Sequence, residues 1–564
     1  MDSEKKRRTS KPKVKTGCRT CKVRRVKCDE GRPACKRCVS TGRVCDGYGI
    51  WNEQRKATLG GNPGVPRVFQ TLLSSYNAPV PIPHSACAER KCMEWFTQCT
   101  IFKIGGVFPS QFWGRTVVQA LSQEPAVRHA VLALASTHRY RAQRRDKSCS
   151  VASYLSEHEK FTLQHYNKAI GCLQAELRRN SKRAQSMRVA LITCIVFVAL
   201  ELMRGQYRTS YTHLQHGLKL VKEIQRLSGA SRAGRVLVRT SSQTNEDDII
   251  EIFSRLGVHY ALLGHGTEYA NLGGYDIQPR LLPYQFRSIE QARQHLDILL
   301  ARAQCLVEMV RYIETDMCVS TQGHEQFLES QWRLEKDLTI WLDVYGLSLG
   351  QFSAQELIHT LARRLLEMYH TMALIMVKTC IPWDDETAFD LQTDRFTSII
   401  REAVGICQAL RTTYPDFPTG GTSLNCPLGM AITMDIGFIQ PLYYTALKCR
   451  IPQIRRHAIE LLRLAPHREG IWNGILTARI AEEVVAHEEQ NIDASLTSGI
   501  RLDLLSLPEV GDSISRILPY LCRISDVRVE MPDENTGEAT VSFWQRENGS
   551  SWKVDERKFQ TEDP

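Results

Sequence analysis

The sequence lacks the segments that would place it in or across a membrane. Its first 15 residues, MDSEKKRRTSKPKVK, are charged where a secretory signal needs an apolar core, so we expect no signal peptide. The longest apolar run, residues 189–200, spans about 12 residues, whereas roughly 20 are needed to cross a bilayer. We therefore predict a soluble chain in a reducing compartment, where close cysteine pairs favour a metal over a disulfide.

Several enzyme motifs are also missing. His324-Glu325 and His487-Glu488 each lack the second histidine of an HExxH zinc hydrolase. Residues 420–423, Gly-Gly-Thr-Ser, have no adjoining lysine and so cannot form a phosphate-binding P-loop. No Gly-x-Gly-x-x-Gly is present. These absences predict that the chain is not an enzyme.

The positive charge is concentrated in one place. Residues 1–48 hold sixteen Lys and Arg against five Asp and Glu, a net charge of +11, and the other 516 residues carry only +1 of the total of +12. Concentrated positive charge favours a polyanionic partner. A cluster typical of a nuclear import signal lies at the start, although a disordered basic arm that adds phosphate contacts fits equally well. The cluster consists of Lys5, Lys6, Arg7 and Arg8, followed by Lys11, Lys13 and Lys15.

Six of the nineteen cysteines lie in one short segment with a repeated spacing. Residues 18–45 contain two copies of C-x2-C-x6-C joined by six residues. A C-x2-C pair lets two thiolates reach one ion. Tetrahedral zinc needs four ligands, so two ions held by six sulfurs require two of the sulfurs to bridge. The candidate ligands are Cys18, Cys21, Cys28, Cys35, Cys38 and Cys45.

Other uses of these cysteines fit less well. A redox pair at Cys18 and Cys21 would need a thioredoxin-like fold around it, and four further cysteines crowd this pair. A RING-type zinc module generally has histidine among its ligands, and no histidine precedes His84. A disulfide-stapled secreted domain would need a signal peptide. We therefore predict zinc, at two ions per chain, as the cofactor.

With these residues the segment resembles the zinc binuclear cluster (Zn2Cys6) DNA-binding domains of fungal transcription factors. The resemblance includes all six cysteines, a basic run, the pair Cys28-Asp29 and Pro33. It implies two short helices related by a pseudo-twofold axis, with Cys18 and Cys35 bridging both zinc ions. It also implies DNA sites that contain CGG triplets.

The basic run predicts how double-stranded DNA is read. Residues 19–25 are expected to form about two turns of helix, with Arg24 and Arg25 near its end. Arginine bidentate to guanine O6 and N7 is the commonest base-specific contact, and the resemblance places the base-reading residues at these two positions. The remaining basic residues are expected to hold phosphates, although any one of them could be a solvated surface charge. They are Arg19, Lys22 and Lys27.

The alternative is a zinc-ordered basic module that grips RNA or a protein partner without base selection. RNA recognition usually adds exposed aromatic side chains on which unstacked bases lie. Residues 1–46 contain no Phe, Tyr, Trp or His. The sequence therefore favours double-stranded DNA as the partner and a nuclear RNA polymerase II transcription regulator as the function.

The predicted organisation has five segments. Residues 1–17 form the basic arm, and 18–46 the DNA-binding domain. Residues 47–85 are rich in Gly and Pro, which predicts a flexible linker and excludes the heptad coiled coil that dimerises many relatives. Residues 86–525 are expected to form a helical regulatory domain, and 526–564 a tail. Dimerisation would then involve the helical domain, and a monomer on one site is an open alternative.

The predicted fold class is mostly α. Amphipathic spacing recurs from residue 86 to 490, for example at Val127, Ala130, Val131 and Leu134. Residues 189–200 are apolar on every side and predict a central buried helix. The segments 112–139, 165–173, 197–220 and 441–472 resemble the regulatory region of fungal zinc cluster proteins. The resemblance implies contacts with the transcription machinery and control of a biosynthetic gene cluster of secondary metabolism.

Two smaller features complete the predictions. His84, Cys87, Cys92 and Cys99 can be drawn as a second metal site, but Cys92 and Cys99 share a helical stripe with neighbouring aromatic residues, which predicts packing in the core. Residues 527–531, 539–545 and 551–554 alternate in polarity and are separated by turn residues. They predict a small antiparallel sheet.

Overall fold

A computed structural model of the chain divides by its contacts into two compact units, residues 1–65 and 66–564, and each unit is described by itself. The structure describes residues 21, 26–30, 35–41, 87–108, 110–143, 151–179, 183–227, 245–265, 282–315, 321–352, 357–382, 385–413, 432–464, 468–490, 506–507, 518–532, 537–547 and 551–560. The predicted linker, residues 47–85, lies outside this described part.

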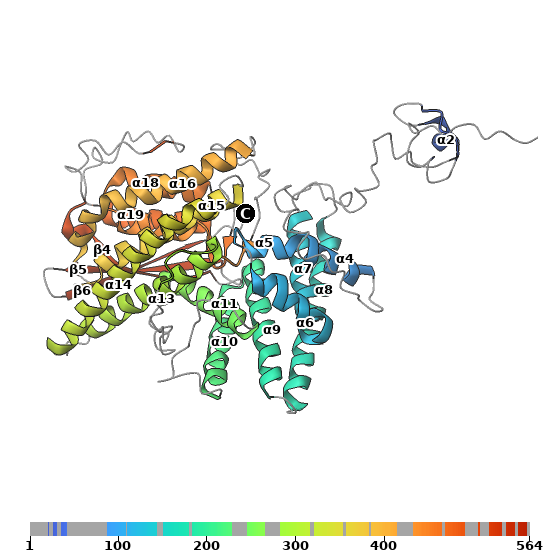
Figure 1. Ribbon diagram of the computed structural model, residues 1–564, viewed down its shortest axis with the longest axis horizontal. Helices are drawn as coiled ribbons and strands as arrows, with labels where there is room; N and C mark the ends of the chain where they lie inside the picture. The colour runs from blue at the N-terminus through green and yellow to red at the C-terminus, as the bar shows by residue number, and fades with distance from the viewer. Residues whose placement is uncertain are drawn as a thin grey trace, which may run out of the picture. The chain divides into compact units, whose positions relative to one another are not determined.

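The first half of the larger unit is a set of helices packed around α9 (Figure 1). Its helices are α4 (Cys87–Trp95), α5 (Ile101–Gly105), α6 (Val117–Gln123), α7 (Pro125–Gln143), α8 (Val151–Arg179), α9 (Arg183–Arg204), α10 (Tyr207–Leu227) and α11 (Asn245–Tyr260). Single π-helical turns occur at η2 (Phe96–Thr100) between α4 and α5, at η3 (Phe112–Thr116) directly before α6, and at η4 (Ala261–His265) directly after α11.

The α9 helix is the centre of this half. It contacts α7, α8, α10 and α11. Its apolar window Gln185–Arg204 is long enough to cross a membrane, but 83% of it is buried within the protein, as in the core helix of a folded domain. Between α9 and α10, Gly205 adopts φ +85°, a left-handed conformation that suits glycine and turns the chain back. The prediction of a buried central helix over residues 189–200 is confirmed.

The second half is built around α15 (Leu357–Lys378). This helix contacts α13 (Ile289–Thr315), α14 (Thr321–Ser348), α16 (Thr393–Thr413) and α17 (Ile439–Lys448). Two further helices, α18 (Pro452–Arg463) and α19 (Gly474–Glu489), pack with α17, and short 3-10 turns occur at η5 (Leu349–Gln351), η6 (Glu386–Gln392) and η9 (Tyr520–Cys522). The predicted mostly α fold class is confirmed.

A miniature sheet that the sequence did not predict helps to join the two halves. The strand β1 (Ile432–Thr433) pairs in parallel with β2 (Arg468–Glu469), which pairs antiparallel with β3 (Trp472–Asn473). Directly after β1, Met434 N donates to Ile104 O of α5 at 2.9 Å. Strands of two residues are too short to show an alternating pattern in a sequence, and their pairing is decided by tertiary contacts.

The predicted C-terminal sheet is confirmed and is larger than expected. Its strands are β4 (Ile524–Glu530), β5 (Glu538–Glu547) and β6 (Ser551–Gln560), paired antiparallel in that order. The prediction ended the third strand at residue 554, and charged residues follow. They continue the strand because β5 offers backbone partners as far as residue 560. Arg557 also pairs with Glu483 of α19, so the sheet packs on the helices.

The larger unit, residues 66–564, is called the helical unit from here on. Two cysteines near its start lie in its core. Cys92 and Cys99 are buried, 5% and 8% exposed, beside the fully buried Phe96. Burial raises the pKa of the Cys92 thiol, as expected for a cysteine packed in an apolar core. The packing interpretation is confirmed for Cys92 and Cys99.

Candidate metal centre and nucleic-acid interface

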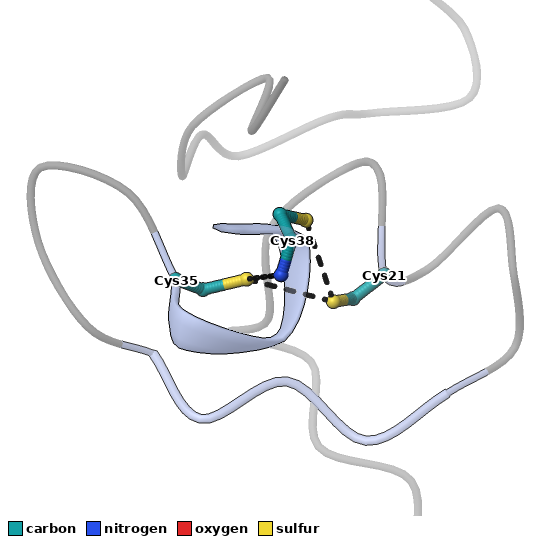
Figure 2. A group of neighbouring side chains, drawn as sticks. All are labelled: Cys21, Cys35 and Cys38. Carbon is teal, nitrogen blue, oxygen red and sulfur yellow. Dashed lines mark hydrogen bonds between the residues drawn. The ribbon is translucent and has the colours of Figure 1, made fainter. Parts of the chain in front are cut away.

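Three cysteine side chains converge in the small N-terminal unit. Cys21, Cys35 and Cys38 are each fully buried. Figure 2 shows their sulfurs facing one another around the short helix α2 (Lys36–Val39). The sulfur of Cys21 lies 3.7 Å from that of Cys35 and 3.9 Å from that of Cys38.

These distances fit zinc better than a disulfide. Disulfide sulfurs are about 2.05 Å apart. A tetrahedral site with a Zn–S distance of about 2.3 Å separates its sulfurs by roughly 3.8 Å. The spacing of the Cys21, Cys35 and Cys38 sulfurs is therefore that of thiolates around one ion, and zinc in this place would supply the cross-links that a unit this small needs to fold.

Cys35 belongs to two groups of candidate ligands. It lies with Cys21 and Cys38 in one, and with Cys28 and Asp29 in the other, and within each group the ligand atoms are less than 4.8 Å apart. A bridging thiolate must reach two ions at once, so this position suits the bridging role that the family resemblance implies for Cys35. Cys18, the other implied bridge, and Cys45 lie outside the described residues.

Backbone N–H groups surround these sulfurs. Cys38 N donates to Cys35 Sγ at 3.3 Å, and Glu30 N donates to Cys28 Sγ at 3.4 Å. Glu30 makes its contact with φ at +58°, an unusual backbone angle for a residue with a side chain. Such donors stabilise negative charge on sulfur, which a metal ligand must carry.

Asp29 ties the two halves of the cysteine repeat together. Its carboxylate accepts from the backbone N–H groups of Lys36 and Arg37 at 2.9 and 3.0 Å, at the start of α2. The backbone hydrogen bond from Arg37 lowers the pKa of Asp29. No role for Asp29 was predicted from the sequence, but the signal was present, since each copy of the repeat ends in Cys-Asp, at 28–29 and 45–46.

Few of the predicted DNA contacts fall in the described part of the chain. Lys27 is exposed, as a phosphate contact must be. Next to it, Val26 N donates to Cys21 O at 3.0 Å, which places Lys27 close to the buried sulfurs. The other predicted residues lie outside the described residues. They are Arg19, Lys22, Arg24 and Arg25, and the cluster Lys5, Lys6, Arg7 and Arg8.

An enzyme-like motif lies in the helical unit. Residues 346–350 read Gly-Leu-Ser-Leu-Gly, the Gly-x-Ser-x-Gly pattern of hydrolase nucleophiles, which the predictions from sequence did not include. Hydrolases expose this serine on a turn between a strand and a helix. Here Ser348 is fully buried at the end of α14, where it donates to Val344 O and accepts from Phe286 N. It serves to close the helix and is not a nucleophile.

Comparisons with protein families match both units. Residues 16–54 match the fungal Zn(2)-Cys(6) binuclear cluster domain. Residues 98–432, more than half of the chain, match the fungal specific transcription factor domain.

Individual relatives agree with these matches. The chain is 23% identical to the aspercryptin biosynthesis cluster-specific transcription regulator of Emericella nidulans, over 84% of this chain and 87% of that protein. It is 29% identical to the transcription regulator lscL of Purpureocillium lilacinum, over 36% of this chain and 48% of that protein. Over only 39 residues, 7% of this chain and 8% of that protein, it is 54% identical to the transcriptional regulatory protein moc3 of Schizosaccharomyces pombe. No solved structure matches the chain.

Proposed function

The chain belongs to the family of fungal Zn2Cys6 transcription factors, and from this we propose that it binds CGG-containing DNA through a cluster of two zinc ions. Family membership makes it a transcription regulator with a zinc-binding DNA-binding domain, and not an enzyme, as the sequence predicted. The finer assignments that follow are proposals.

The observation that carries the proposal is the convergence of the sulfurs of Cys21, Cys35 and Cys38 at the spacing of a tetrahedral zinc site. We assign Cys18, Cys21, Cys28, Cys35, Cys38 and Cys45 as the ligands of two ions, with Cys18 and Cys35 bridging. The position of Cys35 in both ligand groups supports this assignment.

Zinc in this place orders a basic surface. With the cluster formed, Arg24 and Arg25 read guanines in the major groove, and Arg19, Lys22 and Lys27 hold phosphates. The concentration of positive charge in residues 1–48 supports a polyanionic partner. Lys5, Lys6, Arg7 and Arg8 direct the protein to the nucleus, where it regulates transcription by RNA polymerase II.

The target genes belong to a biosynthetic gene cluster. The support is the name of the Emericella nidulans relative, a cluster-specific regulator that aligns along most of both chains. The helical unit carries the regulatory output and its contacts with the transcription machinery. Any dimer forms through this unit, since no heptad repeat follows the cysteines.

The experiment measures affinity of the full-length, zinc-loaded protein for a CGG-containing duplex and for a scrambled duplex of equal length, in moderate salt. We expect the CGG duplex to bind at least tenfold more tightly, roughly the ratio given by one bidentate guanine contact. Equal affinities would favour the alternative function, a zinc-ordered basic module that binds nucleic acid or a protein without base selection.

A matched pair of cysteine variants tests the role of zinc. Cys28→Ser removes a predicted ligand and should abolish the preference for CGG and lower the zinc content measured by elemental analysis. Cys92→Ser changes a buried cysteine of the helical unit and should leave both unchanged. If Cys28→Ser keeps two zinc ions and the preference, the ligand assignment is wrong.

A further inference from the structure

The outer side of α14 exposes two large apolar side chains. The other side of this helix carries Leu334, Leu338 and Trp341, each at most 2% exposed, and packs against α13 and α15. Figure 1 shows the helix at an outer edge of the second half of the unit. Away from the core, Leu328 is 43% exposed, and Trp332, one turn further along, is 62% exposed. The outer side of such a helix is ordinarily polar, so these two neighbouring residues indicate a contact surface.

Charged side chains lie before and after Trp332 along the helix. Glu329 comes three residues before it and Lys336 four residues after it, which places all three on one face. Lys336 Nζ lies 5.3 Å from the centroid of the Trp332 ring. Arg333 Nη2 lies 2.5 Å from Glu329 Oε1, in a pair whose side chains are 63% and 58% exposed. An exposed pair contributes little, so the Glu329 carboxylate can accept from a second cation. We call these five residues, Leu328, Glu329, Trp332, Arg333 and Lys336, the Trp332 surface.

The order of charges around Trp332 is complementary to its own reverse. Along the helix an acid comes first, then the tryptophan, then a base. A second copy that runs in the opposite direction presents the base first and the acid last. A two-fold axis between positions 332 and 333 therefore places Glu329 opposite Lys336 of the partner subunit, and Lys336 opposite Glu329 of the partner subunit. The two Trp332 side chains then lie together at the centre. A foreign helix with charges of one sign would match only one of the two groups.

We propose that the Trp332 surface is the contact between two copies of this chain, which pack with their α14 helices antiparallel. Tryptophan near the centre of an interface is among the residues that contribute most to binding, and Leu328 extends the apolar contact. The opposite charges beside the tryptophan fix the antiparallel register. The inference rests on the proposed function in one respect, because there any dimer forms through the helical unit.

The contact is small, and the dimer it forms is weak. Two single helices bury less surface than the roughly 1,600 Å² of a standard interface, so we expect a dissociation constant on the order of 10 μM. A weak dimer is sufficient on DNA, because joining two DNA-binding modules raises their combined affinity for neighbouring sites well above that of either module alone.

Sedimentation velocity of the full-length, zinc-loaded protein, without DNA, measures this association. We expect mostly monomer at about 0.5 μM and mostly dimer at about 50 μM. Trp332→Ala should raise the dimer dissociation constant at least about tenfold. Tyr284→Ala is the matched control, because Tyr284 is also exposed, at 86%, but lies ahead of α13 and outside α14. It should leave the dissociation constant unchanged.

Exchanging the two charges separates a contact between copies from a role within one chain. Glu329→Lys and Lys336→Glu should each raise the dissociation constant roughly three- to tenfold, since each places like charges opposite one another. Mixing the two variants in equal amounts should restore association to about the wild-type level, because opposite charges meet at both contacts of the mixed dimer. A role within a single chain could not produce this rescue.

A wild-type protein that stays monomeric up to about 50 μM would overturn the proposal and leave the Trp332 surface to a different partner. A dimer that is unchanged in Trp332→Ala would place the contact elsewhere and overturn it as well. If the mixed charge variants associate no better than either one alone, the antiparallel arrangement is wrong. Because no DNA is present, each of these results is distinguishable from failure of the DNA-binding proposal.

Discussion

Arg293 of α13 and Asp435, which follows β1, form a buried two-armed ion pair between positions 142 residues apart in the chain. Arg293 Nη1 donates to Asp435 Oδ2 at 2.5 Å, and Nη2 donates to the other carboxylate oxygen. The side chains are 1% and 7% exposed. The pair links α13, in the second half of the helical unit, to the segment directly after β1, which also contacts α5.

Breaking this pair should destabilise the helical unit strongly. Asp435→Asn removes the carboxylate that both arms of the buried Arg293 contact and leaves only Asp297, 3.5 Å from Arg293 Nε. We expect the free energy of unfolding to fall by as much as about 3–5 kcal/mol in urea denaturation followed by circular dichroism. Glu223→Gln is the control, because the Glu223–Arg226 pair is exposed on α10 and should contribute less than about 1 kcal/mol. Similar losses in both variants would contradict this reasoning.

The same pair predicts an acid dependence. Burial raises the pKa of Asp435, but the Arg293 guanidinium lowers it by a larger amount. The pKa of Asp435 therefore lies below its usual value of 3.8. A depressed carboxyl pKa contributes stability above the unfolded-state pKa, and that stability is lost as the pH falls through the folded-state pKa. The stability difference between wild type and Asp435→Asn should therefore be constant near neutral pH and shrink below about pH 4.

Arg25 and Lys27 should differ in what they contribute to DNA binding. Arg25→Ala should reduce the discrimination between CGG and scrambled duplexes by about 1–3 kcal/mol without loss of zinc. Lys27→Ala should weaken binding to both duplexes equally. It should also reduce the slope of log affinity against log salt concentration by about 1, the value for one phosphate contact. Fluorescence anisotropy titrations at several salt concentrations measure both quantities. Unchanged discrimination in Arg25→Ala would show that another residue reads the bases.

Asp29 should support zinc binding without being a ligand itself. Asp29→Ala removes the acceptor for the N–H groups of Lys36 and Arg37, and so loosens the helix that carries Cys38. We expect zinc affinity, measured by competition with a chelating dye, to fall roughly tenfold while the number of bound ions stays at two. Glu30→Gln removes a neighbouring negative charge but keeps the backbone N–H that contacts Cys28, and should have little effect. A loss of one ion in Asp29→Ala would contradict a purely supporting role.

Two helical glycines should respond oppositely to alanine. A Cβ on Gly217 of α10 would overlap the ring of Phe253 and lie 3.0 Å from Cys194 Sγ, so Gly217→Ala should destabilise by about 1–3 kcal/mol. A Cβ on Gly171 of α8 meets nothing within 4 Å, so Gly171→Ala should stabilise by about 0.5–1 kcal/mol through helix propensity. Changes of the same sign in urea denaturation would show that packing around α10 differs from the structure.

Parts of this protein could be predicted because their signals are local. The buried helix over 189–200 and the three C-terminal strands are each indicated by the hydropathy pattern of a short stretch of sequence. The predicted strands were too short because a strand end depends on its partner, and residues 555–560, the first four of them charged, continue to pair with β5. Ser348 shows the limit of a motif, since Gly-x-Ser-x-Gly taken alone would suggest a nucleophile and the burial of Ser348 in a helix excludes one.

The sequence by itself determined the family, the six-cysteine repeat with its basic surroundings and the helical class, because spacing, charge and periodicity are properties of neighbouring residues. Only the tertiary structure decided that the Cys21, Cys35 and Cys38 sulfurs converge, that Asp29 accepts hydrogen bonds from the start of α2, and that Arg293 meets Asp435. Those contacts join residues that are distant in the chain, and they arise because the folding chain must bury its apolar faces and still satisfy the polar groups it buries.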